Sequence, residues 1–202
     1  MQANVVSRLL GVVICLLILH GCSQAPERTL PPTDDPLSER AAESMAAGDF
    51  LAAANLYRQL ATTTTDPALR SSYLLAAAEA AAQGGDWDGV RESVALLQGY
   101  PFGSPDDLRY RILGTELMLR EMRPLDAIDV LGASPGPEVP NHLAIRYFRV
   151  LARTYRQMGN LLESANALQQ VDALLTDIDE RLATQTEILR TLVLLNDMAL
   201  ER

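Results

Sequence analysis

Apolar residues along this chain follow two different patterns. Near the N-terminus, residues 9–19 form one continuous apolar run. From about residue 39 onward, apolar residues recur every three or four positions instead, as in Leu74, Leu75, Ala78 and Ala81. This spacing places apolar side chains on one face of an α-helix. Most of the chain is therefore predicted to be helical.

The helical patterns are interrupted by tight-turn sequences at a fixed interval. The turns begin at Gly48, Gly85, Met122 and Gly159, which are 37 residues apart each time. Glycine tolerates the left-handed backbone that ends many helices. Five residues after each turn start stand Ala53, Val90, Ala127 and Ser164. Because the alanines and the serine are small enough to let two helices approach closely, each unit is predicted to be a helix, a tight turn and a second helix.

A single helical hairpin cannot cover its own apolar face, whereas stacked hairpins bury a continuous core. The pattern resembles the tetratricopeptide repeat, most clearly at residues 48–57 and 151–159. We therefore expect an all-α, TPR-like solenoid of about four hairpins over residues 39–175. Since that repeat usually has about 34 residues, the extra residues predict longer loops between hairpins, at residues 62–67, 99–105 and 134–140.

Residues 176–202 are predicted to form an additional helix. A fifth turn is due at Asn196, which lies 37 residues after Gly159. The predicted helix is more apolar than a terminal cap should be, with Ile188, Leu189, Leu192, Val193, Leu194 and Leu195. We interpret it as the start of a further repeat in a truncated chain, or as a helix that another surface covers.

The continuous apolar run has the features of a bacterial export signal. It follows Arg8, is too short to span a bilayer of roughly 30 Å, and ends in Leu19-His20-Gly21-Cys22. This ending resembles the lipobox of bacterial lipoproteins, which implies a signal peptide over residues 1–21 and acylation of Cys22. Ser23, in place of Asp, implies attachment to the outer membrane on its periplasmic side. The alternative is an unmodified Cys22 thiol in an ordinary secreted protein.

Residues 22–38 are predicted to be a lipidated tether. The segment is rich in proline and polar residues, so it has little apolar surface to bury and favours an extended chain. Fully extended, it would hold the folded part about 50 Å from the lipid, at about 3.1 Å per residue.

Composition narrows the function classes. The chain has 202 residues, a formal net charge of -9 and only 5% aromatic residues, and all of its 17 basic residues are arginine. An abundance of Ala and Leu with few aromatic residues disfavours an all-β fold. The acidic balance argues against binding to nucleic acid.

The sequence offers little catalytic chemistry. Beyond the predicted signal peptide it has one histidine, His142, and neither a phosphate-binding loop nor a dinucleotide-binding motif. We expect no cofactor, no metal site and no enzymatic activity. Four pairs of acids are the remaining candidates, at positions 34/35, 106/107, 126/129 and 177/179. We expect them to cap helices or to lie on solvated faces.

One group of side chains is a candidate binding site. Arg146, Arg149, Arg153 and Arg156 are spaced by three, four and three residues, which places them on one stripe of a helix. We refer to these four residues as the arginine stripe. Guanidinium groups bind carboxylates bidentately, so the stripe is a candidate site for peptidoglycan peptides or an acidic partner. The alternative is a solvated helix face paired with neighbouring acids.

Taken together, the lipobox, the proline-rich spacer and the helical repeats resemble the N-terminal region of the LpoA family. These are outer-membrane lipoproteins that activate a class A penicillin-binding protein. The resemblance is strongest from residue 107 through residues 146–148 to residues 174–179, and then at residues 186–192. It implies a regulator of peptidoglycan synthesis, in which this chain supplies the anchor and the helical reach. Family members contact the synthase through a C-terminal domain that is missing here, so the resemblance assigns no partner-binding residue.

A second function class stays open. A repeat-containing lipoprotein of this kind is also suited to scaffold outer-membrane protein assembly, or pilus and secretion machinery. An enzyme acting on cell-wall glycans is a distant third.

Overall fold

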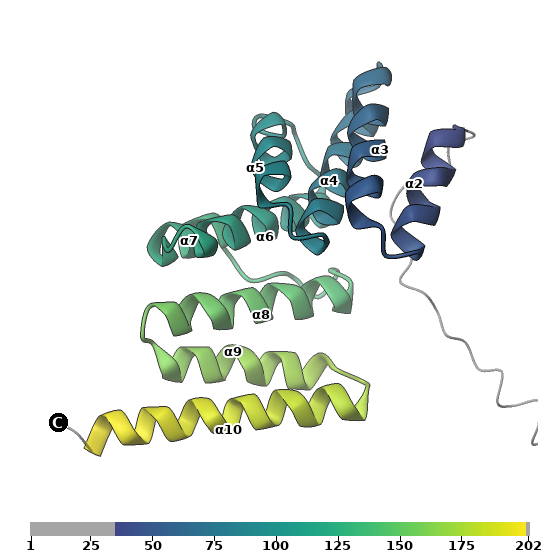
Figure 1. The fold of residues 1–202 in the computed structure, drawn as a ribbon. Coiled ribbons are helices and arrows are strands. Elements are labelled where there is room, and N and C mark those ends of the chain that lie inside the picture. Colours follow the sequence, from purple (N-terminus) through teal and green to yellow (C-terminus); the bar gives the residue numbers. More distant parts are fainter. Residues whose placement is uncertain (1–34, 201–202) are drawn as a thin grey trace, which may run out of the picture. The chain divides into compact units, whose positions relative to one another are not determined.

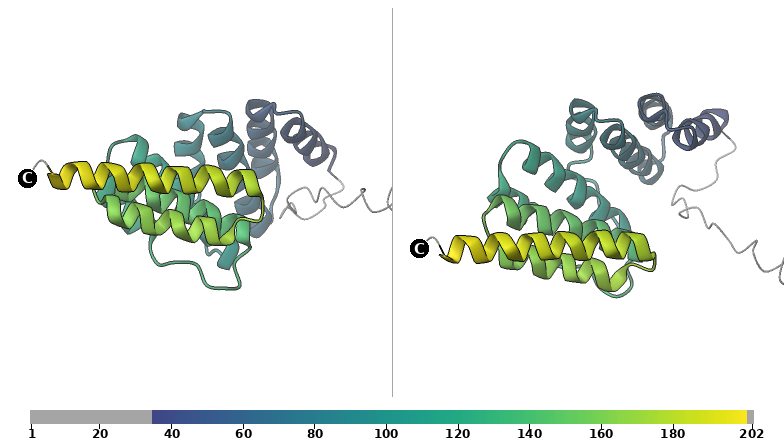
Figure 2. Two further views of the ribbon diagram at one scale, coloured as in Figure 1. Left: turned by 90° about the horizontal axis from the view of Figure 1, so that it is seen from below. Right: turned by 60° about the horizontal axis from the view of Figure 1, so that its bottom comes forward.

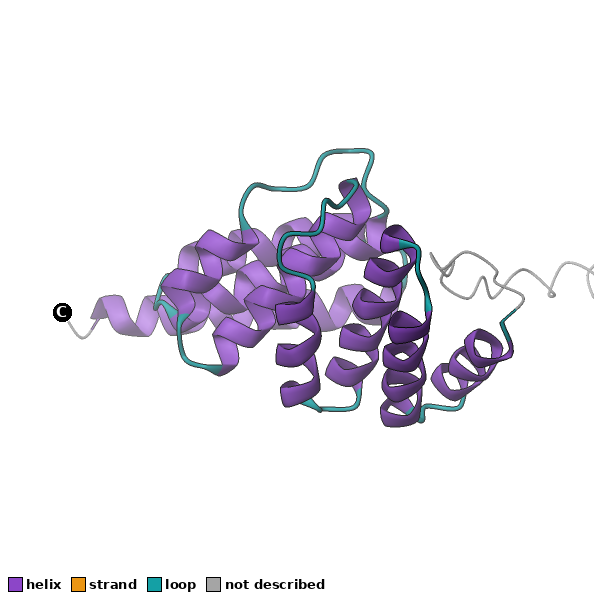
Figure 3. Cartoon of the chain, turned by 90° about the horizontal axis from the view of Figure 1, so that it is seen from above, coloured by secondary structure: helices purple, strands orange, loops and turns teal. Residues whose placement is uncertain are grey.

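The computed structural model describes residues 35–200, apart from the side chains of residues 104 and 197–200. Within this range all regular structure is helical (Figure 3). The helices are α2 (Pro36–Ala46), α3 (Phe50–Thr63), α4 (Pro67–Gln83), α5 (Trp87–Leu96), α6 (Ser104–Arg120), α7 (Pro124–Leu131), α8 (Asn141–Gln157), α9 (Leu161–Leu174) and α10 (Ile178–Leu200). The predicted all-α, TPR-like fold is confirmed.

Consecutive helices pair into four hairpins: α2 with α3, α4 with α5, α6 with α7, and α8 with α9. Helix α10 packs against α9, and Figures 1 and 2 show α8, α9 and α10 side by side. Neighbouring hairpins also touch through their first helices, α4 with α6 and α6 with α8. The stacking predicted from the repeat is therefore present.

The four predicted turns share one backbone geometry. Their first residues are left-handed, with φ of 77° at Gly48, 75° at Gly85, 59° at Met122 and 77° at Gly159. In each turn the amide of the next residue bonds the carbonyl five residues back, as from Asp49 to Ser44 at 2.9 Å and from Asp86 to Ala81 at 2.9 Å. This is the Schellman ending of a helix, in which the last carbonyls find donors.

The repeat length of 37 has a simple construction. Helices α4, α6 and α8 each have 17 residues, and three residues separate each from the next helix. The second helix and the connection that follows it always add up to the same length, so a shorter helix is followed by a longer connection. Thus α3 and α9 have 14 residues and short connections, whereas α5 has ten, α7 has eight, and both have longer ones.

The predicted loops were consequently only partly right. The loops around residues 99–105 and 134–140 exist, but Thr62 and Thr63 belong to α3. Gly99, Pro101, Gly132 and Pro135 occupy the long connections, and such residues end helices. No glycine or proline occurs from Phe50 to Asp66, so α3 continues for two more residues than expected.

Helix contacts inside each hairpin rely on small side chains, as predicted. Ala53, Val90, Ala127 and Ser164 are each 0% exposed. The Ser164 hydroxyl donates to the carbonyl of Ala152 at 2.9 Å, across the hairpin α8–α9. A larger side chain at these positions would push the two helices apart.

Helix α10 departs from the expected repeat. The turn predicted at Asn196 does not form, because α10 continues to Leu200. Positions 41, 78, 115 and 152 repeat at intervals of 37 and hold small residues that are at most 1% exposed, whereas the equivalent Leu189 of α10 is 64% exposed. Further exposed apolar side chains on α10 are Ile178, Leu182, Leu192, Val193 and Leu194.

Several sequence predictions concern the N-terminus. The signal peptide over residues 1–21 and the lipidation of Cys22 lie outside the described residues. Of the predicted tether, only its last residues are described. They correct its boundary, since α2 begins at Pro36 and Asp35 caps it by accepting from the amide of Leu37 at 2.8 Å. Among the described helices, none is both long and apolar enough to cross a membrane.

Met122 provides a test of the turn geometry. A left-handed backbone costs a non-glycine residue roughly 1–2 kcal/mol, and the Met122 side chain is 74% exposed. We expect Met122→Gly to raise the free energy of unfolding by about 1 kcal/mol, measured by urea denaturation. Met122→Ala is the matched control, because it removes the same exposed side chain and keeps the strain. Equal stabilities of the two variants would contradict this account.

Candidate functional site

The arginine stripe lies on α8, and each of its members forms an ion pair. Arg146 contacts two acids, through Nη1 to Oε1 of Glu79 at 3.1 Å and through Nη2 to Oε2 of Glu116 at 2.9 Å. The other distances are 3.1 Å for Arg149–Glu180, 3.1 Å for Arg153–Glu116 and 2.6 Å for Arg156–Glu187.

Four arginines therefore face four glutamates from neighbouring helices. The structure matches the alternative interpretation of the stripe, a helix face paired with acids, because no guanidinium of the four lacks a carboxylate partner. An anionic ligand would have to compete with a glutamate at each arginine that it bound.

The centre of this face is an ion-pair ladder across three hairpins. It consists of Glu79 on α4, Arg109 and Glu116 on α6, and Arg146 and Arg153 on α8. Glu79 and Glu116 are 37 residues apart, and so are Arg109 and Arg146. Each glutamate thus pairs with an arginine 30 residues later, on the first helix of the next hairpin. We call these five residues the Glu–Arg ladder.

The pair Glu79–Arg109 is the best enclosed part of the ladder. Arg109 donates from Nε to Oε1 of Glu79 at 3.1 Å and from Nη2 to Oε2 at 2.6 Å. It also donates to Asp106 at 2.8 Å. The side chains are 7% and 20% exposed. Such a bidentate pair, shielded from water, fixes the relative position of α4 and α6.

Burial and pairing act in opposite directions on the pKa of Glu79. Burial by itself would raise the pKa of this carboxyl, but the hydrogen bonds and charge of Arg109, together with Arg146, outweigh it and lower the pKa below its ordinary value of 4.5. The carboxylate therefore stays ionised inside the ladder.

The stripe extends the ion pairing to α10. Arg149 and Arg156 reach Glu180 and Glu187, each 31 residues later in the chain. All four of these side chains are at least 40% exposed. Exposed pairs of this kind contribute roughly 0–1 kcal/mol, so they orient α10 more than they stabilise it.

Two hollows lie beside the ladder. One, of about 310 Å³, is lined by Glu79, Gln83 and Trp87 together with stripe residues. The other, of about 290 Å³, lies between the stripe, Leu168 and Glu187. The Arg120 guanidinium lies 3.9 Å from the centre of the Trp87 ring, a cation–π contact that helps to hold Trp87 in place.

The remaining sequence candidates are dispersed. His142 is exposed at the start of α8. The predicted capping role is seen for Asp35 and for Asp177, whose side chain accepts from the amide of Glu180 at 2.9 Å. Asp106, Asp107 and Asp126 each pair with an arginine on the same helix or next to it. The described residues contain no cluster of potential metal ligands.

Sequence reasoning found the stripe but missed its partners. Glu79, Glu116 and Arg109 carry no local motif, and their pairing joins helices 30 residues apart. A signal was nevertheless present, because glutamate recurs at one position of the repeat and arginine at another. Only a known stacking order of the hairpins could turn that recurrence into contacts.

The fold and the ladder define this protein as an array of helical hairpins cross-linked by ion pairs. A solved structure of LpoA from Haemophilus influenzae, in a monoclinic form, is similar to it with a TM-score of 0.54 and 16% sequence identity. The match covers 69% of this chain and 25% of the LpoA chain. It shows an LpoA-like fold. No protein-family model and no curated protein sequence matches the chain.

Glu79→Gln tests the ladder. Removing this charge leaves Arg109 enclosed with only Asp106 as a carboxylate partner, so we expect a loss of about 2–4 kcal/mol in the free energy of unfolding near neutral pH. Urea denaturation measures it. Glu187→Gln, which removes an exposed ion pair, is the matched control and is expected to cost less than about 1 kcal/mol.

The same variant has a defined pH dependence. Because folding lowers the pKa of Glu79, its stabilisation is complete above the ordinary value of 4.5 and is lost as the pH falls through the lowered value. The stability difference between the native chain and Glu79→Gln should therefore shrink at acid pH. A difference that stays constant from neutral pH to about pH 3 would contradict the ladder as the cause.

Proposed function

We propose that this chain is the anchoring and helical part of an outer-membrane lipoprotein that regulates peptidoglycan synthesis. In this proposal it acts with a class A penicillin-binding protein as an activator and is not itself an enzyme. The observation that carries the proposal is the combination of a lipobox-like Cys22 with a helical-hairpin array that has an LpoA-like fold.

The structure suits a positioning role. Hairpins joined by the Glu–Arg ladder resist bending between α4, α6 and α8. A stiff array of this kind would hold whatever follows it at a fixed position relative to its first hairpin. The described helices cross-link their hairpins through paired acids and arginines, which suits this positioning role.

The proposal assigns synthase contact to a part of the protein beyond this chain. The match spans only 25% of the H. influenzae LpoA chain, and in the family that the sequence resembles the synthase is contacted by a different domain. The helical part would then span part of the distance from the membrane to the synthase and orient the rest of the protein. Peptidoglycan is a candidate ligand along its length.

Reconstitution tests the activator role. The natural full-length protein is expected to raise glycan polymerisation or crosslinking by its purified class A synthase, while residues 22–202 alone are expected to give no stimulation. The readout is product formation from labelled lipid-linked precursor. If the full-length protein leaves the synthase unchanged, the activator role is wrong.

Affinity capture distinguishes the scaffold alternative. Recovery of outer-membrane assembly or secretion components in place of a synthase would favour that function.

Membrane anchoring is tested separately by Cys22→Ala. Without the acylated side chain the protein should appear in the soluble periplasmic fraction, because two acyl chains supply nearly all of its membrane affinity. Cys15→Ala, which alters the other cysteine, is the control and should remain with the outer membrane. A Cys22→Ala protein that still fractionates with the outer membrane would show that lipidation does not anchor it.

A further inference from the structure

A pocket separate from the Glu–Arg ladder lies between α3, α4 and α5. It has a volume of about 450 Å³, within the range of small-ligand sites. Leu74 and Arg70 line it from α4. They stand five and nine residues before the ladder residue Glu79, which places them roughly half a turn around the helix from it. Pocket and ladder therefore occupy different faces of α4.

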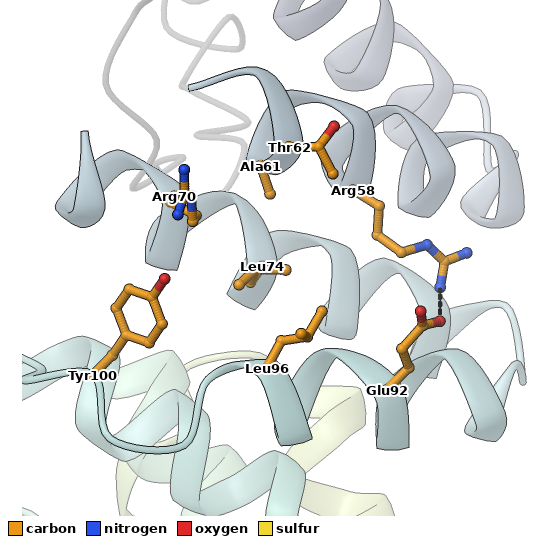
Figure 4. A pocket seen from close by; sticks show the side chains of 8 residues that line it. All are labelled: Arg58, Ala61, Thr62, Arg70, Leu74, Glu92, Leu96 and Tyr100. Atoms are coloured by element: carbon orange, nitrogen blue, oxygen red, sulfur yellow. Dashed lines mark ion pairs between the residues drawn. The ribbon is translucent and has the colours of Figure 1, made fainter. Parts of the chain in front are cut away.

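One end of the pocket carries an uncompensated positive charge. Arg70 lies there with Tyr100, whose ring reaches in from the loop after α5 (Figure 4). Arg70 donates from Nη2 to the carbonyl of Thr64 at 2.8 Å, and its Nε is enclosed without a hydrogen-bond partner. Among the described side chains, no carboxylate forms an ion pair with it. A partly desolvated guanidinium with unused donors favours an anion.

The middle of the pocket is apolar. Ala61, Leu74 and Leu96 lie between the two ends (Figure 4). Leu96 is 54% exposed, which is unusual for a large apolar side chain facing a concave surface. An aliphatic group bound here would remove this surface from water, gaining about 25 cal/mol for each Å² buried.

The opposite end offers both a donor and an acceptor. Arg58 and Glu92 face each other there, but Nη1 and Oε2 are 3.9 Å apart, too far for a hydrogen bond. Arg58 is also 4.0 Å from Asp86. Arg58 also donates from Nη2 to Oδ1 of Asn55 at 2.7 Å. A peptide group beside this pair could accept from a remaining guanidinium N–H of Arg58 or donate to the Glu92 carboxylate, whereas a hydrocarbon chain could do neither.

We propose that this pocket binds the C-terminal end of a peptide whose last residues are aliphatic. The terminal carboxylate pairs with Arg70 and accepts from the Tyr100 hydroxyl. The aliphatic side chains cover Leu74 and Leu96, and the preceding peptide group lies beside Arg58 and Glu92. This site is independent of the proposed synthase regulation, so either can fail without the other.

Binding of an acetylated Gly-Leu-Leu tripeptide with a free carboxylate tests the proposal. Isothermal titration of the full chain is expected to show saturable binding, and the C-terminal amide should bind at least about tenfold more weakly, since a charged hydrogen-bonded pair is lost. Arg70→Gln should weaken the free acid by a similar factor and leave the amide unchanged.

Two further variants keep the test decisive if Arg70→Gln lowers stability. Leu96→Glu changes an exposed side chain, places an anion in the pocket and should abolish binding, whereas Leu162→Glu, at a leucine that is 53% exposed on α9, should not. Arg190→Gln, an exposed arginine on α10, is the control for charge.

Three outcomes would overturn the proposal. These are equal binding of acid and amide, binding unaffected by both Arg70→Gln and Leu96→Glu, and no binding at millimolar peptide. Octanoate carries the same carboxylate on an aliphatic body without a peptide group. If it bound more tightly than the tripeptide, the ligand would be a fatty acid and the peptide assignment would be wrong.

Discussion

The left-handed residue at each hairpin turn sets the geometry on which the rest of this array depends. At Gly48, Gly85, Met122 and Gly159 it follows the end of the first helix, and the second helix begins two residues later. The second helix therefore always presents the same side to the first helix of its hairpin. As a result Ala53, Val90, Ala127 and Ser164 all point into their own hairpin and are fully buried. The length of 37 persists although α5 and α7 are short, because longer connections follow these two helices.

The Glu–Arg ladder is the second consequence of this regularity. A glutamate on one first helix meets an arginine on the next because the hairpins stack with a constant offset. Glu79 and Arg109 are enclosed, whereas Arg149 and Arg156 pair with α10 at the surface. The same type of contact thus holds hairpins together at the centre and only aligns helices at the end. The arginines that looked like a binding surface are part of what organises the array.

Two faces of α4 carry different chemistry. The face around Glu79 is electrically balanced, since its acids and arginines satisfy one another. The face around Arg70 and Leu74 combines apolar side chains and a pocket with a guanidinium that has no ion-pair partner among the described side chains. Within this helical array, the first face serves rigidity, and the second is the one that we propose binds a ligand.

The sequence by itself determined the hairpins, because their signals are local. Gly85 followed by Asp86, a small residue five positions later and the three-to-four spacing of apolar residues act within one unit. The tertiary structure decided three other features. The partners of the stripe came from α4, α6 and α10, and such distant contacts depend on how hairpins stack. Helix α10 continued through Asn196, since neither glycine nor proline ends it there. The pocket beside Arg70 arose where three helices meet, which no single segment of sequence encodes.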